Sequence, residues 1–197
     1  MGNTTPLSPS LPLPVSGGLA TPRVSSPGAG PLVLGIDPGG KGAIAAMSLS
    51  GDPLGIWDWP GSAAELWELV AGESLLKPRL VAMEAQHGFF MSRGSSENGG
   101  RSATINFNLG CNYGIWQGVA AVLGWPMILV STAAWRKEVL DSTVPASKPQ
   151  KSDIIAFTRR RWPTAEIAGP RGGAKDGRAE ALCLAEYARQ RARGGRS

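Results

Sequence analysis

Four carboxylates in this sequence lie where a cation-binding site could form. Asp37 follows an apolar run in LVLGIDPGG, and Glu84 closes the run RLVAME. Asp176 and Glu180 are four residues apart in KDGRAEALCLAEYA, so on a helix they share one face and repel each other. Carboxylate oxygens suit Mg²⁺ or Mn²⁺, and two such ions about 4 Å apart can activate a water and stabilise the leaving oxygen of a phosphodiester.

Each of these residues also has a purely structural interpretation. Asp37 can cap the turn before Pro38, and Glu84 can form an ion pair with a neighbouring cation. Asp176 can serve as a helix N-cap, and Glu180 can be a solvated helix residue. The hypothesis of a metal site therefore depends on whether the fold brings all four together.

The pattern of apolar residues predicts the elements that would position them. Strands are expected at 32–36, 42–49, 53–58, 79–84 and 126–130, and helices at 62–73, 107–124, 132–140, 151–162 and 175–190. Ser62 is the expected N-cap of the first helix. Three hairpin strands followed by alternating helices and strands predict an α/β fold with a five-stranded mixed sheet flanked by helices. Because the carboxyl ends of central strands share one rim, Asp37 and Glu84 are expected to meet there.

Composition divides the chain into a leader, one domain and a tail. Residues 1–30 are rich in Pro, Ser and Gly and carry one charge, which predicts disorder. Residues 31–190 are expected to form one domain, and 191–197 a basic flexible tail. The leader lacks the features of a secretory signal, and a plastid address is an alternative to a cytoplasmic, nucleoid-associated location. No run approaches the roughly 18 apolar residues of a membrane span.

The distribution of charge and the two cysteines indicate the kind of partner and the cellular environment to expect. Residues 1–147 hold 8 Lys and Arg against 10 Asp and Glu, whereas residues 148–197 hold 12 against 5. Such a basic quarter favours a polyanionic partner, most often nucleic acid, although a solvated helix face is the alternative. Cys111 and Cys183 are predicted to be reduced core residues of an intracellular protein.

Taken together, the motifs resemble those of the RuvC-type Holliday junction resolvases of the RNase H-like superfamily. The resemblance covers about residues 32–189 and is nearest to the branch with the chloroplast resolvase and related bacterial and phage proteins. It rests on GIDPG, AMEAQ and GRAEA, and on YGIWQG, AAWRK and KSDIIAFTRRRWP between them.

The resemblance implies a homodimeric endonuclease that nicks two strands of a four-way DNA junction symmetrically during recombination and repair. Asp37, Glu84, Asp176 and Glu180 would bind two Mg²⁺ ions per site, and Mn²⁺ would substitute. The segment after Glu84 would enter the junction. The residues implied in DNA binding are Gln86, His87, Phe89, Phe90, Arg136, Lys137, Lys151 and Arg178, with Arg136 as a substitute for Lys137.

Other functions are compatible with the same residues. An RNase H-like nuclease for other branched DNA or RNA–DNA hybrids would need the same carboxylates, and a non-catalytic DNA-binding module could keep the fold. The GIDPGG turn also resembles a phosphate loop of actin-like ATPases, but that fold needs about twice this length and a second such loop. The helix around Tyr113–Val122 could form the dimer contact or belong to the core.

Overall fold

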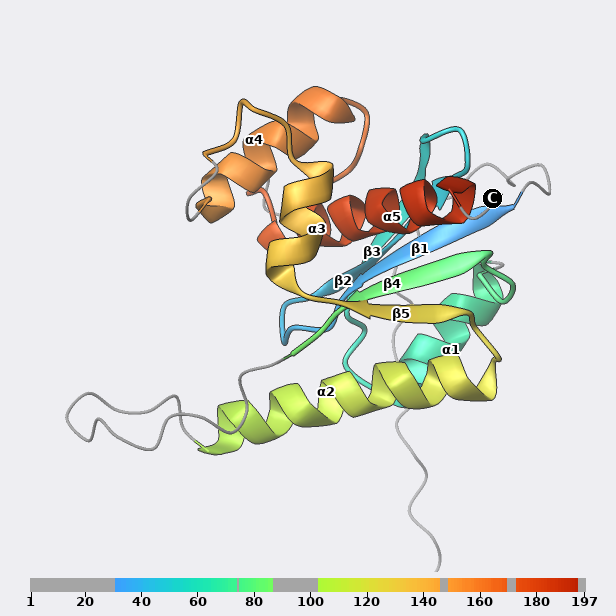
Figure 1. Ribbon diagram of the computed structural model, residues 1–197. Helices are drawn as coiled ribbons and strands as arrows, with labels where there is room; N and C mark the ends of the chain where they lie inside the picture. The colour runs from blue at the N-terminus through green and yellow to red at the C-terminus, as the bar shows by residue number, and fades with distance from the viewer. Residues whose placement is uncertain (1–30, 74, 87–102, 146–148, 170–172, 195–197) are drawn as a thin grey trace, which may run out of the picture.

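A mixed β-sheet forms the centre of the protein. The computed structural model describes residues 31–73, 75–86, 103–145, 149–169 and 173–194. In these residues five strands are ordered β3-β2-β1-β4-β5 (Figure 1). Their bounds are Leu32–Asp37 (β1), Ala43–Ser48 (β2), Pro53–Asp58 (β3), Leu80–Glu84 (β4) and Met127–Val130 (β5). The first three strands pair antiparallel, whereas β4 is parallel to β1 and to β5.

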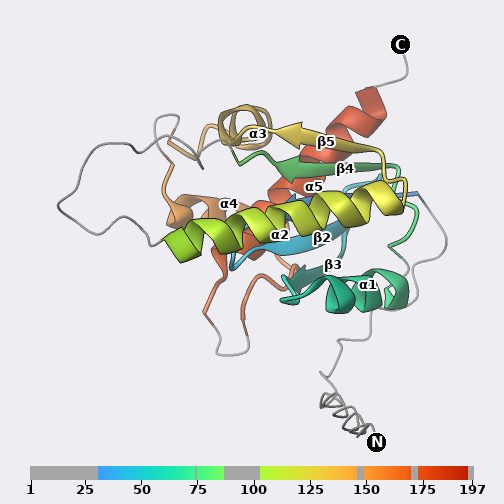
Figure 2. The ribbon, with the colours of Figure 1, turned by 90° about the horizontal axis from the view of Figure 1, so that it is seen from below.

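Helices cover both faces of this sheet. On one face lie α1 (Ala63–Gly72) and α2 (Ala103–Val122), and on the other α3 (Thr132–Val139), α4 (Lys151–Arg161) and α5 (Asp176–Gly194), as Figures 1 and 2 show. Of the second group, α5 lies directly on the sheet, and α3 and α4 pack against α5. The predicted α/β fold with a five-stranded mixed sheet flanked by helices is confirmed.

Alternation along β1 explains how one strand serves two cores. Leu34 and Ile36 pack towards α1 and α2, whereas Val33 belongs to the core under α5. Gly35 points the same way as Val33, and a Cβ there would lie 2.0 Å from the backbone nitrogen of Ala185. Since no real Cβ tolerates that distance, the glycine allows α5 to lie directly on β1.

Most predicted elements are confirmed to within a few residues. Strand β3 has the predicted bounds, and the Ser62 hydroxyl accepts a hydrogen bond from Glu65 N–H, as expected of the N-cap of α1. Helix α2 begins at Ala103, four residues before the predicted start.

The end of α5 corrects the predicted tail. The helix continues to Gly194, so residues 191–194 are helical rather than part of a flexible tail. The Arg191 guanidinium lies 5.0 Å from the centre of the Tyr187 ring one turn earlier on the same helix, and it forms an ion pair with Glu138 of α3. Residues 195–197, like the leader 1–30, lie outside the described residues.

The two cysteines differ in environment. Cys183 is buried in the core under α5, as predicted, but Cys111 is exposed on α2 and the prediction of a core position was wrong. The opposite face of α2 supplies the core instead, through Trp116 and Ala120. Both cysteines are free thiols. Within the described part of the chain, no helix is long and apolar enough to cross a membrane.

Candidate active site

The carboxyl ends of β1 and β4 bring Asp37 and Glu84 together. Ile36 pairs with Met83 in the parallel register, so the next residues of both strands are neighbours. Asp37 has the same parity as Val33, and Glu84 the same parity as Ala82, and both of these residues belong to the core under α5. Both carboxylates therefore lie on the α3 and α5 face at one end of the sheet.

Asp37 combines a tight turn with a buried carboxylate. Its Oδ1 accepts a hydrogen bond of 2.9 Å from Gly39 N–H, and Gly42 N–H closes the turn on the Gly39 carbonyl. Burial, helped by the nearby Glu84 and Asp176 carboxylates, raises the pKa of Asp37 to about 6, although the Gly39 N–H and Lys151 oppose this rise. Such a group resists ionising unless a cation compensates its charge.

Glu84 is held by two neutral donors from α3. The Thr132 hydroxyl donates to Oε1 at 2.5 Å, and the Trp135 indole N–H donates to Oε2 at 3.2 Å. Ser131 caps this helix by accepting from Ala134 N–H. The carboxylate that closes the apolar strand thus finds its partners 48 and 51 residues away in the sequence.

Asp176 and Glu180 lie on the first two turns of α5, where each contacts a cation. Lys151 forms an ion pair with Asp176, and Arg136 donates to Glu180 Oε1 at 3.2 Å. The hydrogen bond from Lys151 lowers the pKa of Asp176. Burial, followed by the charges of Asp37 and Glu84, raises the pKa of Glu180 to about 7, although Arg136 opposes this.

These mutual effects show that the structure gathers the four predicted carboxylates into one electrostatic cluster. Asp37 is coupled to the other three, because Glu84 and Asp176 raise the pKa of Asp37 and Asp37 raises the pKa of Glu180.

Gly177 explains the close approach of α5 to β1. A Cβ there would lie 2.3 Å from the Lys41 carbonyl oxygen and 3.0 Å from Asp37 Oδ2.

A second cluster of charged side chains forms ion pairs between the start of α5 and the end of β3. Arg178 donates to both carboxylate oxygens of Asp58, at 2.7 and 3.1 Å, and Lys175 forms an ion pair with the same group at 2.5 Å. Arg178 also donates to the carbonyls of Glu166 and Ala168. Although burial opposes it, these cations hold the pKa of Asp58 below its usual value.

The donor set of the four carboxylates fits a divalent cation chemically. They carry four negative charges when ionised, and only Arg136 and Lys151 form ion pairs with them among the described residues. In the described part of the chain, however, no group of three or more such side chains is arranged to hold a metal ion as it stands. Cation binding would therefore require the side chains of Asp176 and Glu180 to turn from their present partners.

Only some of the residues predicted to bind DNA lie near the four carboxylates. Gln86 follows Glu84 at the same end of the sheet and is half-buried. Arg136, rather than the exposed Lys137, reaches the carboxylates, and Lys151 reaches them from α4. The donors of Arg178 are occupied by protein acceptors, so its phosphate contact stays a prediction that this arrangement does not favour. Residues His87, Phe89 and Phe90 lie outside the described residues.

Three residues near the site were missed by the sequence analysis. Thr132 and Trp135 stood in the predicted helix 132–140 without an assigned role, and Asp58 was only the last residue of a strand. A carboxylate that ends an apolar strand was the one available signal, because it demands a partner. Nothing local in the sequence indicated which residues would supply it.

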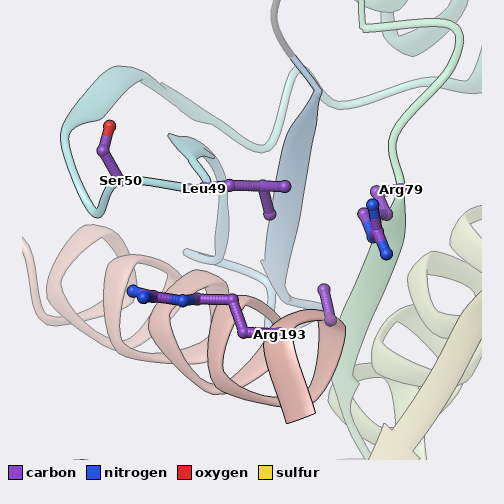
Figure 3. Close-up of a pocket in the computed structure, with 5 residues that line it drawn as sticks. Leu49, Ser50, Arg79 and Arg193 are labelled. Carbon is purple, nitrogen blue, oxygen red and sulfur yellow. The ribbon is translucent and has the colours of Figure 1, made fainter. Parts of the chain in front are cut away.

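A cavity of about 330 Å³ lies at the other end of the sheet. It is lined by Leu49, Ser50, Arg79, Ala192 and Arg193 (Figure 3). Leu49 follows β2, Arg79 precedes β4, and Arg193 stands near the end of α5, so this cavity is a full strand length away from the carboxylates. Its lining contains no acid and no metal ligand of the carboxylate type. It is therefore separate from the candidate active site.

Comparison with known proteins identifies the fold but not a sequence family. No family model and no curated protein sequence matches the chain. Among solved structures, Thermus thermophilus RuvC in complex with a Holliday junction substrate matches with a TM-score of 0.56 at 16% identity, over 84% of this chain and 96% of that chain. Thermus thermophilus RuvC in a second structure matches with a TM-score of 0.52 at 19% identity, over 82% and 97%.

These matches cover nearly the whole of the RuvC chains and most of this one. At such low sequence identity the matches show how the strands and helices are arranged, and they do not show the activity. The five-stranded mixed sheet with helices on both faces is an α/β arrangement that fits the RNase H-like fold. The chain therefore has the RNase H-like fold of the RuvC-type resolvases.

Proposed function

We propose that this protein is a divalent-cation-dependent endonuclease that cuts four-way DNA junctions. The observation that carries the proposal is the cluster of Asp37, Glu84, Asp176 and Glu180 at one end of the sheet. The RuvC-like fold supports the proposal, because one of the matching RuvC structures is a complex with a Holliday junction substrate. The basic charge of residues 148–197 also suits a DNA partner.

The four carboxylates would hold the cations. Mg²⁺, or Mn²⁺ in its place, supplies Lewis acidity that stabilises charge on a phosphodiester undergoing hydrolysis. Asp37 and Glu84 present their carboxylates from rigid strand ends, and Asp176 and Glu180 complete the set from α5. If Asp176 and Glu180 held cations, Lys151 and Arg136 would lose their present carboxylate partners and would be free to contact DNA phosphates.

Symmetric cleavage would require two copies of the chain. Along α2 an exposed stripe follows the spacing of one helix face, and both its ends are apolar: Phe107 is 70% exposed and Val122 is 87% exposed. The α2 stripe consists of Phe107, Cys111, Gly114, Gly118, Ala121 and Val122, all exposed. Small residues in its middle would let two helices approach closely, and we propose it as the dimer contact.

The first experiment is cleavage of a synthetic mobile four-way junction in Mg²⁺ by the wild type and Asp37→Asn. We expect paired, symmetric nicks from the wild type and a loss of at least about 1000-fold in the variant, because Asp37 is coupled to all the other carboxylates. Junction binding should persist. Asp52→Asn, an exposed acid in the turn after β2, is the matched control and should cleave normally.

Other outcomes would identify the alternative functions. Junction binding without nicking in Mg²⁺ or Mn²⁺ would indicate a non-catalytic DNA-binding module. Cleavage of RNA–DNA hybrid or of other branched DNA in preference to the four-way junction would reassign the substrate. Equal cleavage by Asp37→Asn and wild type would remove the carboxylate cluster from the mechanism altogether.

The dimer contact is tested by Gly118→Arg. A long charged side chain in the middle of the α2 stripe should give a monomer by light scattering, and nicks should become single and uncoordinated. Ala64→Arg on α1 is the control, since Ala64 is also exposed on a helix but lies outside the stripe. A monomeric wild type that still makes paired nicks would contradict this part of the proposal.

A further inference from the structure

The two oxygens of the Glu84 carboxylate are both engaged by α3. Thr132, the first residue of the helix, donates to Oε1, and Trp135, one turn later, donates to Oε2. Residues three apart lie on one helix face, so the two donors form a fork around the carboxylate. Ser131 caps the helix, and the Trp135 side chain is fully buried. The fork is therefore built on a rigid support.

The donors are neutral, which distinguishes Glu84 from the carboxylates on α5. Asp176 and Glu180 are paired with Lys151 and Arg136, whose positive charges oppose the binding of another cation. A hydroxyl and an indole N–H fix a carboxylate in place but leave its negative charge intact. An ionised carboxylate has about four acceptor positions, so two donors leave room for a further ligand interaction.

The choice of a carboxylate as partner distinguishes Trp135 from two other buried tryptophans of this protein. The indole N–H of a buried tryptophan usually finds a hydrogen-bond partner, and in this protein Trp125 donates to the Leu76 carbonyl and Trp162 to the Gly51 carbonyl. Trp135 donates instead to a carboxylate that belongs to the candidate active site. The same helix turn also carries Arg136, which lies 5.3 Å over the Trp135 ring and contacts Glu180.

We propose that Thr132 and Trp135 are positioning residues that orient Glu84 for divalent-cation binding. This inference rests on the proposed function, because it assumes that Glu84 is a cation ligand. The fork would hold the carboxylate in its binding orientation before the cation arrives. Partners of this kind typically contribute 10- to 100-fold to metal affinity.

The test is direct binding of Mn²⁺ to the full-length protein without DNA, by titration calorimetry or electron paramagnetic resonance. Thr132→Val removes the hydroxyl with little change of shape, and Trp135→Phe removes the N–H but keeps an aromatic ring. We expect each to weaken Mn²⁺ binding by about tenfold. Thr132→Ser restores a donor and should recover most of the affinity.

Two matched controls account for the loss of a buried hydrogen bond as such. Trp125→Phe removes an indole N–H bond to Leu76 on the far side of the sheet, and Thr158→Val removes a buried hydroxyl that donates to the Ile154 carbonyl. Both should lower thermal stability and leave Mn²⁺ affinity unchanged. If they weaken Mn²⁺ binding as much as Thr132→Val does, the positioning role is wrong.

A double-mutant cycle with Glu84→Gln separates positioning from a general structural effect. In the Glu84→Gln background, Thr132→Val should cause no further loss of Mn²⁺ affinity, whereas additive losses would overturn the inference.

Junction cleavage is measured separately from Mn²⁺ binding, so that failure of the fork and failure of the proposed function can be told apart. A wild type that binds Mn²⁺ through the fork but cuts no junction would refute the proposed function alone. A wild type that cuts junctions with Mn²⁺ affinity unaffected by Thr132→Val and Trp135→Phe would refute the fork alone.

Discussion

The carboxylates on the strands and those on α5 are held by different kinds of partner. Asp37 and Glu84 accept hydrogen bonds from the Gly39 backbone, Thr132 and Trp135, all of them neutral. Asp176 and Glu180 are instead paired with Lys151 and Arg136. Neutral donors orient a carboxylate without cancelling its charge, whereas cations neutralise it. On the proposed function, the strand pair would be available to a divalent cation as it stands, whereas the α5 pair would first have to give up its present partners.

The two pairs also differ in what fixes the backbone beneath them. The strand pair rests on the parallel register of β1 and β4 in the middle of the sheet. The position of the α5 pair depends on the contact of Gly177 with the Lys41 carbonyl and on the ion pairs of Asp58 with Lys175 and Arg178. A small displacement of α5 would therefore separate the two pairs while leaving each intact.

Among changes that leave all four carboxylates in place, the largest effect is expected from Gly177→Ala. The added Cβ would lie 2.3 Å from a backbone oxygen, so the start of α5 must move away from β1. Because a displacement of about 1 Å can cost roughly 100-fold in rate, we expect junction cleavage to fall by about that factor. Gly40→Ala, in the neighbouring turn, meets nothing within 4 Å and should cleave normally. Equal activity of the two variants would show that α5 can be displaced without harm.

The pH dependence of the cation-free protein should report the burial of Asp37 and Glu180 and, after it, the repulsion among the carboxylates. The pKa values of Asp37 and Glu180, about 6 and 7, exceed the ordinary values of 3.8 and 4.5. The folded protein therefore binds more protons than the unfolded chain between pH of about 4 and 7, and this contribution to stability is lost as pH rises through that window. The lowered pKa values of Asp58, Asp176 and Glu186 act at lower pH, below the ordinary carboxyl values.

This effect is measured by thermal unfolding in EDTA at pH 5 and pH 8. We expect a melting temperature a few degrees lower at pH 8, and a smaller difference in Asp37→Asn and Glu180→Gln, which remove the raised groups. Added Mg²⁺ should stabilise the protein more at pH 8 than at pH 5, because binding must displace protons at the lower pH. A pH difference that is unchanged in both variants would assign it to other groups.

The smallest effect is expected from Lys151→Met. Lys151 is 74% exposed in its side chain, so the loss of its ion pair with Asp176 should change stability by less than about 1 kcal/mol. Without a competing ammonium, we expect Mn²⁺ to bind about two- to fivefold more tightly, opposite in sign to Thr132→Val. Lys137→Met, an exposed lysine without a role at the carboxylates, is the control. Weaker Mn²⁺ binding in Lys151→Met would show that both pairs depend on their partners in the same way.

Local patterns predicted the strands, the helices and the four carboxylates because short stretches of sequence are enough to recognise them. Apolar runs and helical spacing located the five strands and five helices of the described residues, and an acid at the end of an apolar run singled out Asp37 and Glu84. The partners could not be predicted in this way. Trp135 reaches Glu84 across 51 residues and Arg178 reaches Asp58 across 120 residues, and no local pattern encodes such distances.

The sequence by itself therefore determined an α/β chain with acids at two strand ends and on one face of its last helix. Only the tertiary structure decided which side chains touch those acids, that α5 continues beyond its predicted end, and that Cys111 faces outward. The physical reason is that secondary structure follows from interactions between residues close along the chain, whereas hydrogen-bond partners and burial depend on which elements the sheet topology places side by side.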